Sequence, residues 1–216
     1  MTFKPLLSVV GVAVLSSVLS ACAPVLIAAP AGAVLGGAGV ATLVAVDRRT
    51  SGIQLEDEGI ELRASSRIRE ALVERGHVTV VSYNRQVLIT GEVPNAQDKA
   101  ALSQVVSRVE NVRAVVNEVA VMENSTLAQR SKDALTTGRV KAALVDAKDL
   151  YASAFKVVTE RGTVYLMGRV TRTEADRGTE IARSVDGVVR VVRVFEIISD
   201  EELKALLPKP APADKK

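Results

Sequence analysis

Few side chains in this sequence have the types and spacing that catalysis or metal binding requires. His77 is the only histidine, and no cysteine or acidic residue stands at metal-ligand spacing around it, which favours a solvated or capping role over zinc binding. A serine nucleophile would need this histidine as its base, and His77 cannot serve alone, so no catalytic triad is predicted. The run Glu56-Asp57-Glu58 precedes an expected helix, where the helix dipole and solvation explain acidic side chains. We therefore predict no enzyme, no metal site and no cofactor.

Cys22, the only cysteine of the chain, is a candidate for covalent modification. Lys4 is followed by a long uncharged apolar run, the layout of a bacterial secretory signal peptide. That run ends in Leu-Ser-Ala-Cys, which resembles the lipobox of bacterial lipoproteins. The resemblance implies a signal peptide over residues 1–21, acyl chains on Cys22 and, because Ala23 rather than Asp follows, sorting to the outer membrane. The alternatives are an unlipidated signal peptide or a membrane helix with a buried thiol.

The uncharged stretch over residues 23–46 has two open interpretations. It is long enough for a transmembrane helix. Against this, its prolines, glycines and frequent alanines give weak helix preference and low hydrophobicity per residue. We favour an apolar tether over residues 22–54 that lies close to the bilayer and enters the folded part through a polar turn at residues 47–52.

Composition and charge limit the possible partners. The chain of 216 residues is 48% hydrophobic but only 3% aromatic, so Val, Leu, Ile and Ala must build its cores. A net charge of +3, without an aromatic and basic surface motif, does not indicate nucleic-acid binding. Residues 55–123 carry 8 Lys+Arg and 11 Asp+Glu, a net charge of −3, whereas residues 127–198 carry 13 and 9, a net charge of +4. An anionic partner is therefore expected on the second half.

The sequence repeats itself. The segment Thr163–Val170 echoes Gln86–Val93, with Gly168 at the position of Gly91, an offset of 168 − 91 = 77 residues. Upstream, residues 138–145 echo residues 66–73. Each copy reads as α-β-β-α-β. Each of the two glycines stands alone, so we predict tight strand-to-helix packing positions and not a phosphate-binding loop.

The apolar spacing within each copy predicts how its elements pack. Segments whose apolar residues have helical spacing alternate with segments in which every second residue is apolar, as in a strand. The last strand of each copy follows a β-α-β crossover, which predicts that it pairs parallel to the strand before the helix. The fold class is therefore α+β, with a three-stranded mixed sheet and two helices on one face in each copy. The predicted core residues of the first copy are Ile60, Ala64, Ile68, Ala71, Leu72, Val78, Val80, Val87, Ile89, Val93, Leu102, Val105, Val106, Val109 and Val112; those of the second are Val140, Ala143, Leu144, Phe155, Val157, Val164, Leu166, Ile181, Ala182, Val185, Val188 and the strand from Val191 to Ile197.

This arrangement resembles the BON domain. The second helix of each copy ends in a similar motif, Val109-Glu110-Asn111-Val112 in the first and Val185-Asp186-Gly187-Val188 in the second. Two copies behind a lipobox are similar to the dual-BON outer-membrane lipoproteins. The resemblance implies BON domains at residues 55–123 and 124–198, and a non-enzymatic, periplasm-facing protein that supports outer-membrane integrity and binds anionic phospholipid.

That family places lipid contact on the first helix of the second copy. The corresponding segment here, from about Leu135 to Tyr151, offers three basic side chains and more apolar ones than a single buried stripe requires. We therefore predict that this segment binds an anionic phospholipid membrane, phosphatidylglycerol or cardiolipin. The predicted contact residues are Leu135, Arg139, Val140, Lys141, Leu144, Lys148, Leu150 and Tyr151. The alternative is that Val140 and Leu144 are core residues, that Tyr151 caps this core and that the lysines form a solvated face.

Two further expectations remain open. In place of lipid binding, the chain could be a structural adaptor that docks onto an envelope protein such as the outer-membrane assembly machinery. Residues 199–216 begin acidic and end rich in Pro, Ala and Lys, which predicts a disordered tail.

Overall fold

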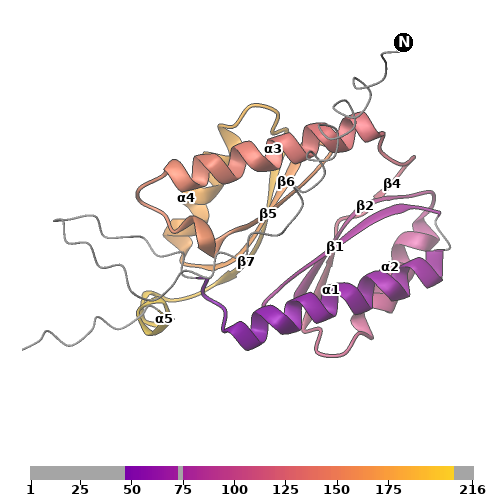
Figure 1. The fold of residues 1–216 in the computed structure, drawn as a ribbon, viewed down its shortest axis with the longest axis horizontal. Helices are drawn as coiled ribbons and strands as arrows, with labels where there is room; N and C mark the ends of the chain where they lie inside the picture. Colours follow the sequence, from indigo (N-terminus) through magenta and orange to yellow (C-terminus); the bar gives the residue numbers. More distant parts are fainter. Residues whose placement is uncertain (1–46, 73–74, 207–216) are drawn as a thin grey trace, which may run out of the picture. The chain divides into compact units, whose positions relative to one another are not determined.

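A computed structural model describes residues 47–72 and 75–206 of the chain (Figure 1). The predicted signal peptide, Cys22, the stretch over residues 23–46 and the end of the tail, residues 207–216, lie outside the described residues. None of the described helices combines the length and the apolar character that a membrane crossing needs.

The first repeat forms an α-β-β-α-β unit whose elements are α1 (Ser51–Leu72), β1 (His77–Tyr83), β2 (Gln86–Val93), α2 (Ala96–Ser107), β3 (Ala114–Asn117) and β4 (Ala120–Val121). Strands β1 and β2 pair antiparallel through a tight turn at Asn84 and Arg85, which both have positive φ angles, 51° and 62°. The crossover through α2 then returns the chain parallel to β2, as the spacing predicts.

The last strand of the first repeat is interrupted, which differs from the predicted three-stranded sheet. Strands β3 and β4 both pair with β2, so this sheet has four strands. Between them Val119 turns into the core and is fully buried. Asn117 supports the break, because its side-chain amide donates to Lys99 O and Ser103 Oγ, each at 2.8 Å, and its oxygen accepts from Val119 N.

The second repeat has the same order without an interruption. It comprises α3 (Leu127–Asp146), the short 3₁₀ helix η1 (Ala152–Ala154), β5 (Lys156–Glu160), β6 (Thr163–Val170), α4 (Arg172–Arg183) and β7 (Arg190–Ile197). Strand β6 is central, antiparallel to β5 and parallel to β7 along its whole length. This three-stranded mixed sheet is the predicted one.

Two helix boundaries differ from the sequence-based expectation. Helix α1 begins at Ser51, inside the stretch assigned to the tether, because Thr50 accepts the first helical hydrogen bond from Gln54 N at 3.0 Å. Residues 200–206, expected to be disordered, form helix α5 (Asp200–Leu206), whose acidic first turn suits the positive end of the helix dipole.

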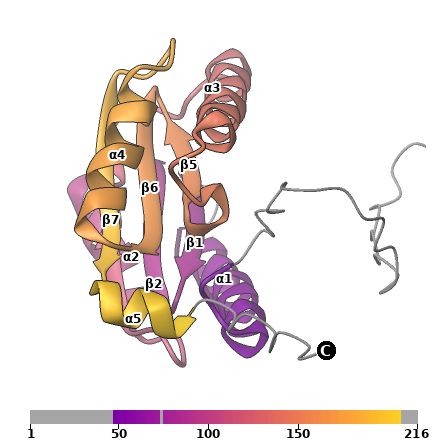
Figure 2. The same ribbon diagram turned by 90° about the vertical axis from the view of Figure 1, so that its left-hand side faces the viewer.

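Each repeat has its own helix-covered core. In the first, Ile60 and Ala64 of α1 and Leu102 and Val106 of α2 pack on Val87 and its alternate neighbours of β2. In the second, α3 and α4 cover the corresponding face of β5–β7 (Figure 2). The predicted apolar core positions are buried or half-buried except Ala71 and Ile197, which are exposed. Both helices of a repeat therefore lie on one face of its sheet.

The other faces of the sheets build a third, shared core. Tyr83 and Leu88 of the first repeat cluster with Tyr165, Met167 and Val194 of the second. Strands β2 and β6 are thus covered on both sides, which explains why they read as nearly continuous apolar runs. How the two repeats associate could not be predicted from the sequence.

Gly91 and Gly168 occupy close-approach positions, although not against the helices that were predicted. A Cβ on Gly91 would lie 2.0 Å from His77 O, and one on Gly168 would lie 2.3 Å from Ala154 O. The contact is with the backbone beside each strand and not with the following helix. Gly91 also has a φ angle of 111°, a conformation that other residues rarely adopt.

Candidate functional site

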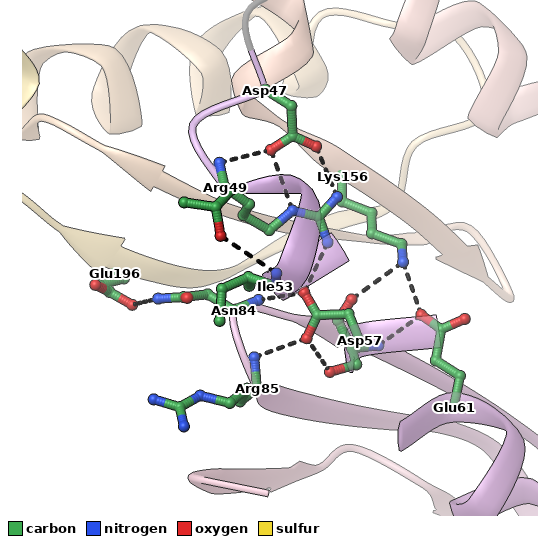
Figure 3. A network of polar contacts seen from close by, with 11 residues as sticks. Asp47, Arg49, Ile53, Asp57, Glu61, Asn84, Arg85, Lys156 and Glu196 are labelled. Atoms are coloured by element: carbon green, nitrogen blue, oxygen red, sulfur yellow. Dashed lines mark hydrogen bonds and ion pairs between the residues drawn. The ribbon is translucent and has the colours of Figure 1, made fainter. Parts of the chain in front are cut away.

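A buried aspartate on the first helix holds the hairpin turn of the first repeat. Asp57 is 1% exposed and accepts hydrogen bonds from Asn84 N and Arg85 N at 2.8 and 2.7 Å, and from Ser82 Oγ at 2.6 Å (Figure 3). Arg49 Nη1 adds an ion pair at 2.8 Å. Burial alone would raise the pKa of Asp57, but these donors outweigh it and lower the pKa. The interpretation of Asp57 as a solvated helix-start acid is therefore wrong.

Asp133 plays the same part in the second repeat. Its carboxylate accepts from Arg161 N and Gly162 N, each at 2.9 Å, in the turn between β5 and β6. Asp57 and Asp133 are 133 − 57 = 76 residues apart. The helix echo inferred from the sequence, residues 66–73 with 138–145, has an offset of 72 and is therefore displaced by four residues. A four-residue shift is about one helical turn, so it preserved the apolar pattern and concealed the error.

Asp57 also gives a pH-dependence that can be measured. Its pKa is lower in the folded chain than the unfolded value of about 3.9, so its stabilisation is complete above roughly pH 5 and is lost as the pH falls through the folded-state pKa. We expect Asp57→Asn to cost about 2 kcal/mol at neutral pH, because charged hydrogen bonds are lost. Urea unfolding between neutral and acidic pH should show the gap from wild type closing as the pH falls. The exposed neighbour change Glu58→Gln is the control, and a gap that stayed constant would contradict the role.

Two arginines tie the start of the folded part to both repeats. Arg49 pairs with Asp57 and lies over the ring of Tyr83, 4.3 Å from its centroid. Arg48 is 3% exposed and binds both carboxylate oxygens of Glu174, at 2.6 and 2.8 Å. Arg48 also donates to Arg169 O at 2.8 Å. The segment that follows the predicted tether is therefore fixed at its first described residues.

Further ion pairs link the repeats beyond the shared apolar core. Glu196 accepts from Asn84 Nδ2 at 2.7 Å (Figure 3). It also accepts from Arg113 Nη2 at 2.5 Å. Lys156 Nζ lies 2.7 Å from Glu61 Oε1. Acids and bases from different repeats thus neutralise one another, which holds the second repeat in a defined position beside the first.

Three of the predicted lipid-contact residues are core residues. Val140 is 0%, Leu144 1% and Leu150 5% exposed, all within the core under α3. Tyr151 is half-buried against that core, with Arg48 near its ring at 5.8 Å from the centroid. These four side chains hold the second repeat together, so Leu135 is the one predicted apolar contact residue that is exposed.

The remaining predicted residues are exposed but do not share one face. Leu135 is 63% exposed and Arg139, one turn later, is also exposed. Lys141 is two residues beyond Arg139, about 200° around the helix. Lys148 lies after the end of α3. The predicted basic cluster is therefore divided between two flanks.

The flank that carries Leu135 and Arg139 borders a groove of about 370 Å³. The turn after β5 and the loop before β7 form the opposite wall, with Arg161, Gly187 and Val189 among the lining residues. Val189 is 82% exposed. The groove therefore combines two exposed apolar side chains with basic ones.

Lys132 is a groove residue that the sequence analysis missed. It lies seven residues before Arg139, and thus on the same side of α3. In the part of the chain that the structure describes, no carboxylate lies within 4.0 Å of the charged nitrogens of Lys132 or Arg139. The i, i+7 spacing could have revealed Lys132, but Val189 comes from a distant loop and leaves no such signal.

His77 has acidic neighbours after all. Its Nδ1 lies 3.4 Å from Glu92 Oε2, and Glu160 approaches from the second repeat. Burial, followed by the charges of Glu92 and Asp133, raises the pKa of Glu160 to about 7. The spacing in the sequence did not indicate these acidic neighbours of His77, because β-sheet pairing brings together residues that are far apart in the sequence.

Comparison with known proteins agrees with the two-repeat architecture. The BON domain model matches residues 56–123 and 132–199. The chain is 38% identical over 168 residues to "Outer membrane lipoprotein DolP" of Haemophilus influenzae, covering 77% of this chain and 87% of that protein. It is 32% identical over 155 residues to the "21 kDa hemolysin" of Actinobacillus pleuropneumoniae, covering 71% of this chain and 80% of that protein. A solved structure of CdsD, from the type III secretion system of Chlamydia trachomatis, covers 68% of this chain and 99% of its own at 14% identity, with a TM-score of 0.28, too low to support an argument.

Proposed function

Because this chain belongs to the BON-domain family and carries two tandem copies of the domain, we propose that it is a lipid-anchored protein of the outer membrane. It faces the periplasm, binds anionic phospholipid through its second BON domain and supports envelope integrity. Its likeness to an outer membrane lipoprotein over most of both chains supports the location.

The groove beside α3 is the observation that carries the lipid-binding role. Lys132 and Arg139 leave two positive charges without a carboxylate partner in the described structure, and a headgroup phosphate would neutralise them. Leu135 and Val189, 63% and 82% exposed, stand at the same groove and can enter the interfacial region of a bilayer. Each basic residue near an anionic surface contributes about 1 kcal/mol. The positive charges and the exposed apolar side chains thus both favour binding of the membrane at this groove.

Vesicle flotation tests this role. A soluble form of residues 47–216, with its folding verified by circular dichroism, is mixed with vesicles of phosphatidylcholine alone or with added phosphatidylglycerol or cardiolipin. We expect binding to the anionic vesicles only, weakening as salt screens the charges. Equal binding to neutral vesicles, or none to anionic vesicles at low salt, would refute the proposal.

Removal of the proposed lipid anchor on Cys22 is expected to detach the protein from the membrane. Several acyl chains on Cys22 hold a protein stably, whereas a single chain gives only marginal binding. Cys22→Ser should therefore release most of the protein from the outer membrane into the soluble periplasmic fraction. Fractionation and intact mass spectrometry measure the outcome. A mature chain that keeps residues 1–21, or an unmodified Cys22, would count against lipidation.

Two exposed leucines on the first helix support an adaptor role for the first repeat. Leu55 and Leu62 of α1 are 71% and 73% exposed and lie seven residues apart, hence on one side of the helix. This repeat is the acidic one, which makes it a poor match for an anionic membrane. A second candidate function is therefore docking of α1 onto an envelope protein such as the outer-membrane assembly machinery. Crosslinking from a photoreactive residue at position 62 in cells would detect such a partner.

A further inference from the structure

Three potential ligand side chains converge where the two repeats meet. His77 begins β1 and pairs directly with Glu92 across the antiparallel ladder. Glu160 ends β5 and comes from the second repeat. One ring nitrogen of His77 and one carboxylate oxygen of each glutamate all lie within 4.8 Å of one another.

The spacing between His77 and Glu92 suits a shared cation better than a shared proton. The 3.4 Å between Nδ1 and Oε2 exceeds a normal N–H···O hydrogen bond. Although Nδ1 is shielded from solvent, it has no hydrogen-bond partner among the described residues. Two donors bound to a tetrahedral zinc ion at about 2.0–2.1 Å would stand about 3.3 Å apart.

Neighbouring groups fix the orientation of Glu92. Its side chain is 0% exposed, and Arg161 Nε holds Oε1 at 2.6 Å. Ser125 N and Oγ contact Oε2, each at 3.2 Å. Such outer contacts hold a ligand in place and commonly accompany metal sites.

Glu160 adds to this cluster a carboxylate that forms no ion pair among the described residues. No Lys or Arg nitrogen lies within 4.0 Å of its carboxylate in the described structure, whereas Glu92 has Arg161. One oxygen of this carboxylate lies within 4.8 Å of a carboxylate oxygen of Glu92. A cation bound between them would lower the repulsion of the two charges.

We propose that His77, Glu92 and Glu160 form a divalent transition-metal site, best matched by Zn²⁺, that joins the two BON domains. An imidazole nitrogen with carboxylate oxygens suits zinc, whereas magnesium and calcium prefer oxygen ligands alone. Three protein ligands leave a fourth position for water, which can enter because the His77 side chain is 26% exposed. The ligands come from both repeats, so the ion would act as a clip between them. This role is independent of the proposed lipid binding.

Zinc titration of the full chain tests the site. The protein is purified from membranes in detergent without a polyhistidine tag, stripped with EDTA and titrated with ZnCl₂ by calorimetry. Thermal unfolding is followed with and without the ion. His77→Gln and Glu160→Gln remove one ligand each, and Glu123→Gln changes a nearby exposed acid whose carbonyl, not its carboxylate, contacts Arg161.

We expect one equivalent of zinc to bind, to raise the melting temperature, and to bind at least tenfold more weakly to both ligand variants but not to Glu123→Gln. Because His77 is the only histidine, its Nδ1 resonance should shift with zinc occupancy. In EDTA, Glu160→Gln should melt no lower than wild type, since it removes a negative charge close to that of Glu92. The zinc titration of Glu160→Gln therefore still tests the site if His77→Gln folds poorly. Absence of zinc uptake, or uptake unchanged in Glu160→Gln, would overturn the site.

Discussion

Reversing the charges of Lys132 and Arg139 together is expected to weaken binding to phosphatidylglycerol vesicles at least thirtyfold. Each Lys→Glu or Arg→Glu change removes one favourable charge and adds a repelling one, and each charge near an anionic surface contributes about 1 kcal/mol. Both residues border the groove that Leu135 and Val189 share, so a headgroup held there would lose its two cations. Flotation at several salt concentrations measures the change.

The second repeat offers a matched control for this experiment. Lys141→Glu with Lys148→Glu alters the net charge equally, but these residues are exposed away from the groove. If net charge alone drives binding, both double variants will lose the same affinity. A loss confined to Lys132 and Arg139 supports the groove, and equal losses would assign binding to the whole basic surface of the domain.

Gly91→Ala is expected to destabilise the chain by more than about 4 kcal/mol, among the larger effects of a single change. The added methyl would lie 2.0 Å from His77 O, and the φ angle of 111° is strained for alanine. The carbonyl belongs to paired backbone, so relief requires β1 to move. Domains are typically stable by only about 5–15 kcal/mol, so the variant should be partly unfolded or unfold at much lower urea concentration.

A second glycine shows that the effect comes from position and not from residue type. Gly138 lies in α3, and a Cβ there would meet nothing within 4 Å. Gly138→Ala should therefore stabilise the chain by about 0.5–1 kcal/mol, because alanine is the better helix former. Urea midpoints of the two variants should move in opposite directions. A Gly91→Ala midpoint close to wild type would show that the strand can yield at this point.

Prediction from sequence worked best for the elements of each repeat. The alternation around Val87 and Ile89, and around Val164 and Leu166, correctly identified strands with one face under helices. Such patterns are local, because a strand turns successive side chains to opposite faces. The helix echo was displaced by four residues for the same reason, since a shift of about one turn leaves the apolar stripe unchanged.

Which side chains of α3 are exposed was predicted less well. Of the residues predicted to contact lipid, Leu135 and Arg139 line the groove, but Val140, Leu144 and Leu150 are buried. Apolar side chains on one helix can serve a core or a ligand, and their order along the chain does not distinguish the two. The exposed fraction of each side chain, which depends on what packs against α3, makes that distinction.

The sequence by itself determined the two copies of the α-β-β-α-β unit, the parallel return of each last strand and the unequal charge of the copies. Only the tertiary structure decided that the sheets share a core through Tyr83 and Met167, and that the third strand of the first repeat breaks at Val119. It alone brought His77 next to Glu160, and Val189 to the groove beside Leu135. Periodicity reports the direction in which a side chain points within its own element. What that side chain meets depends on segments tens of residues away, which no local pattern records.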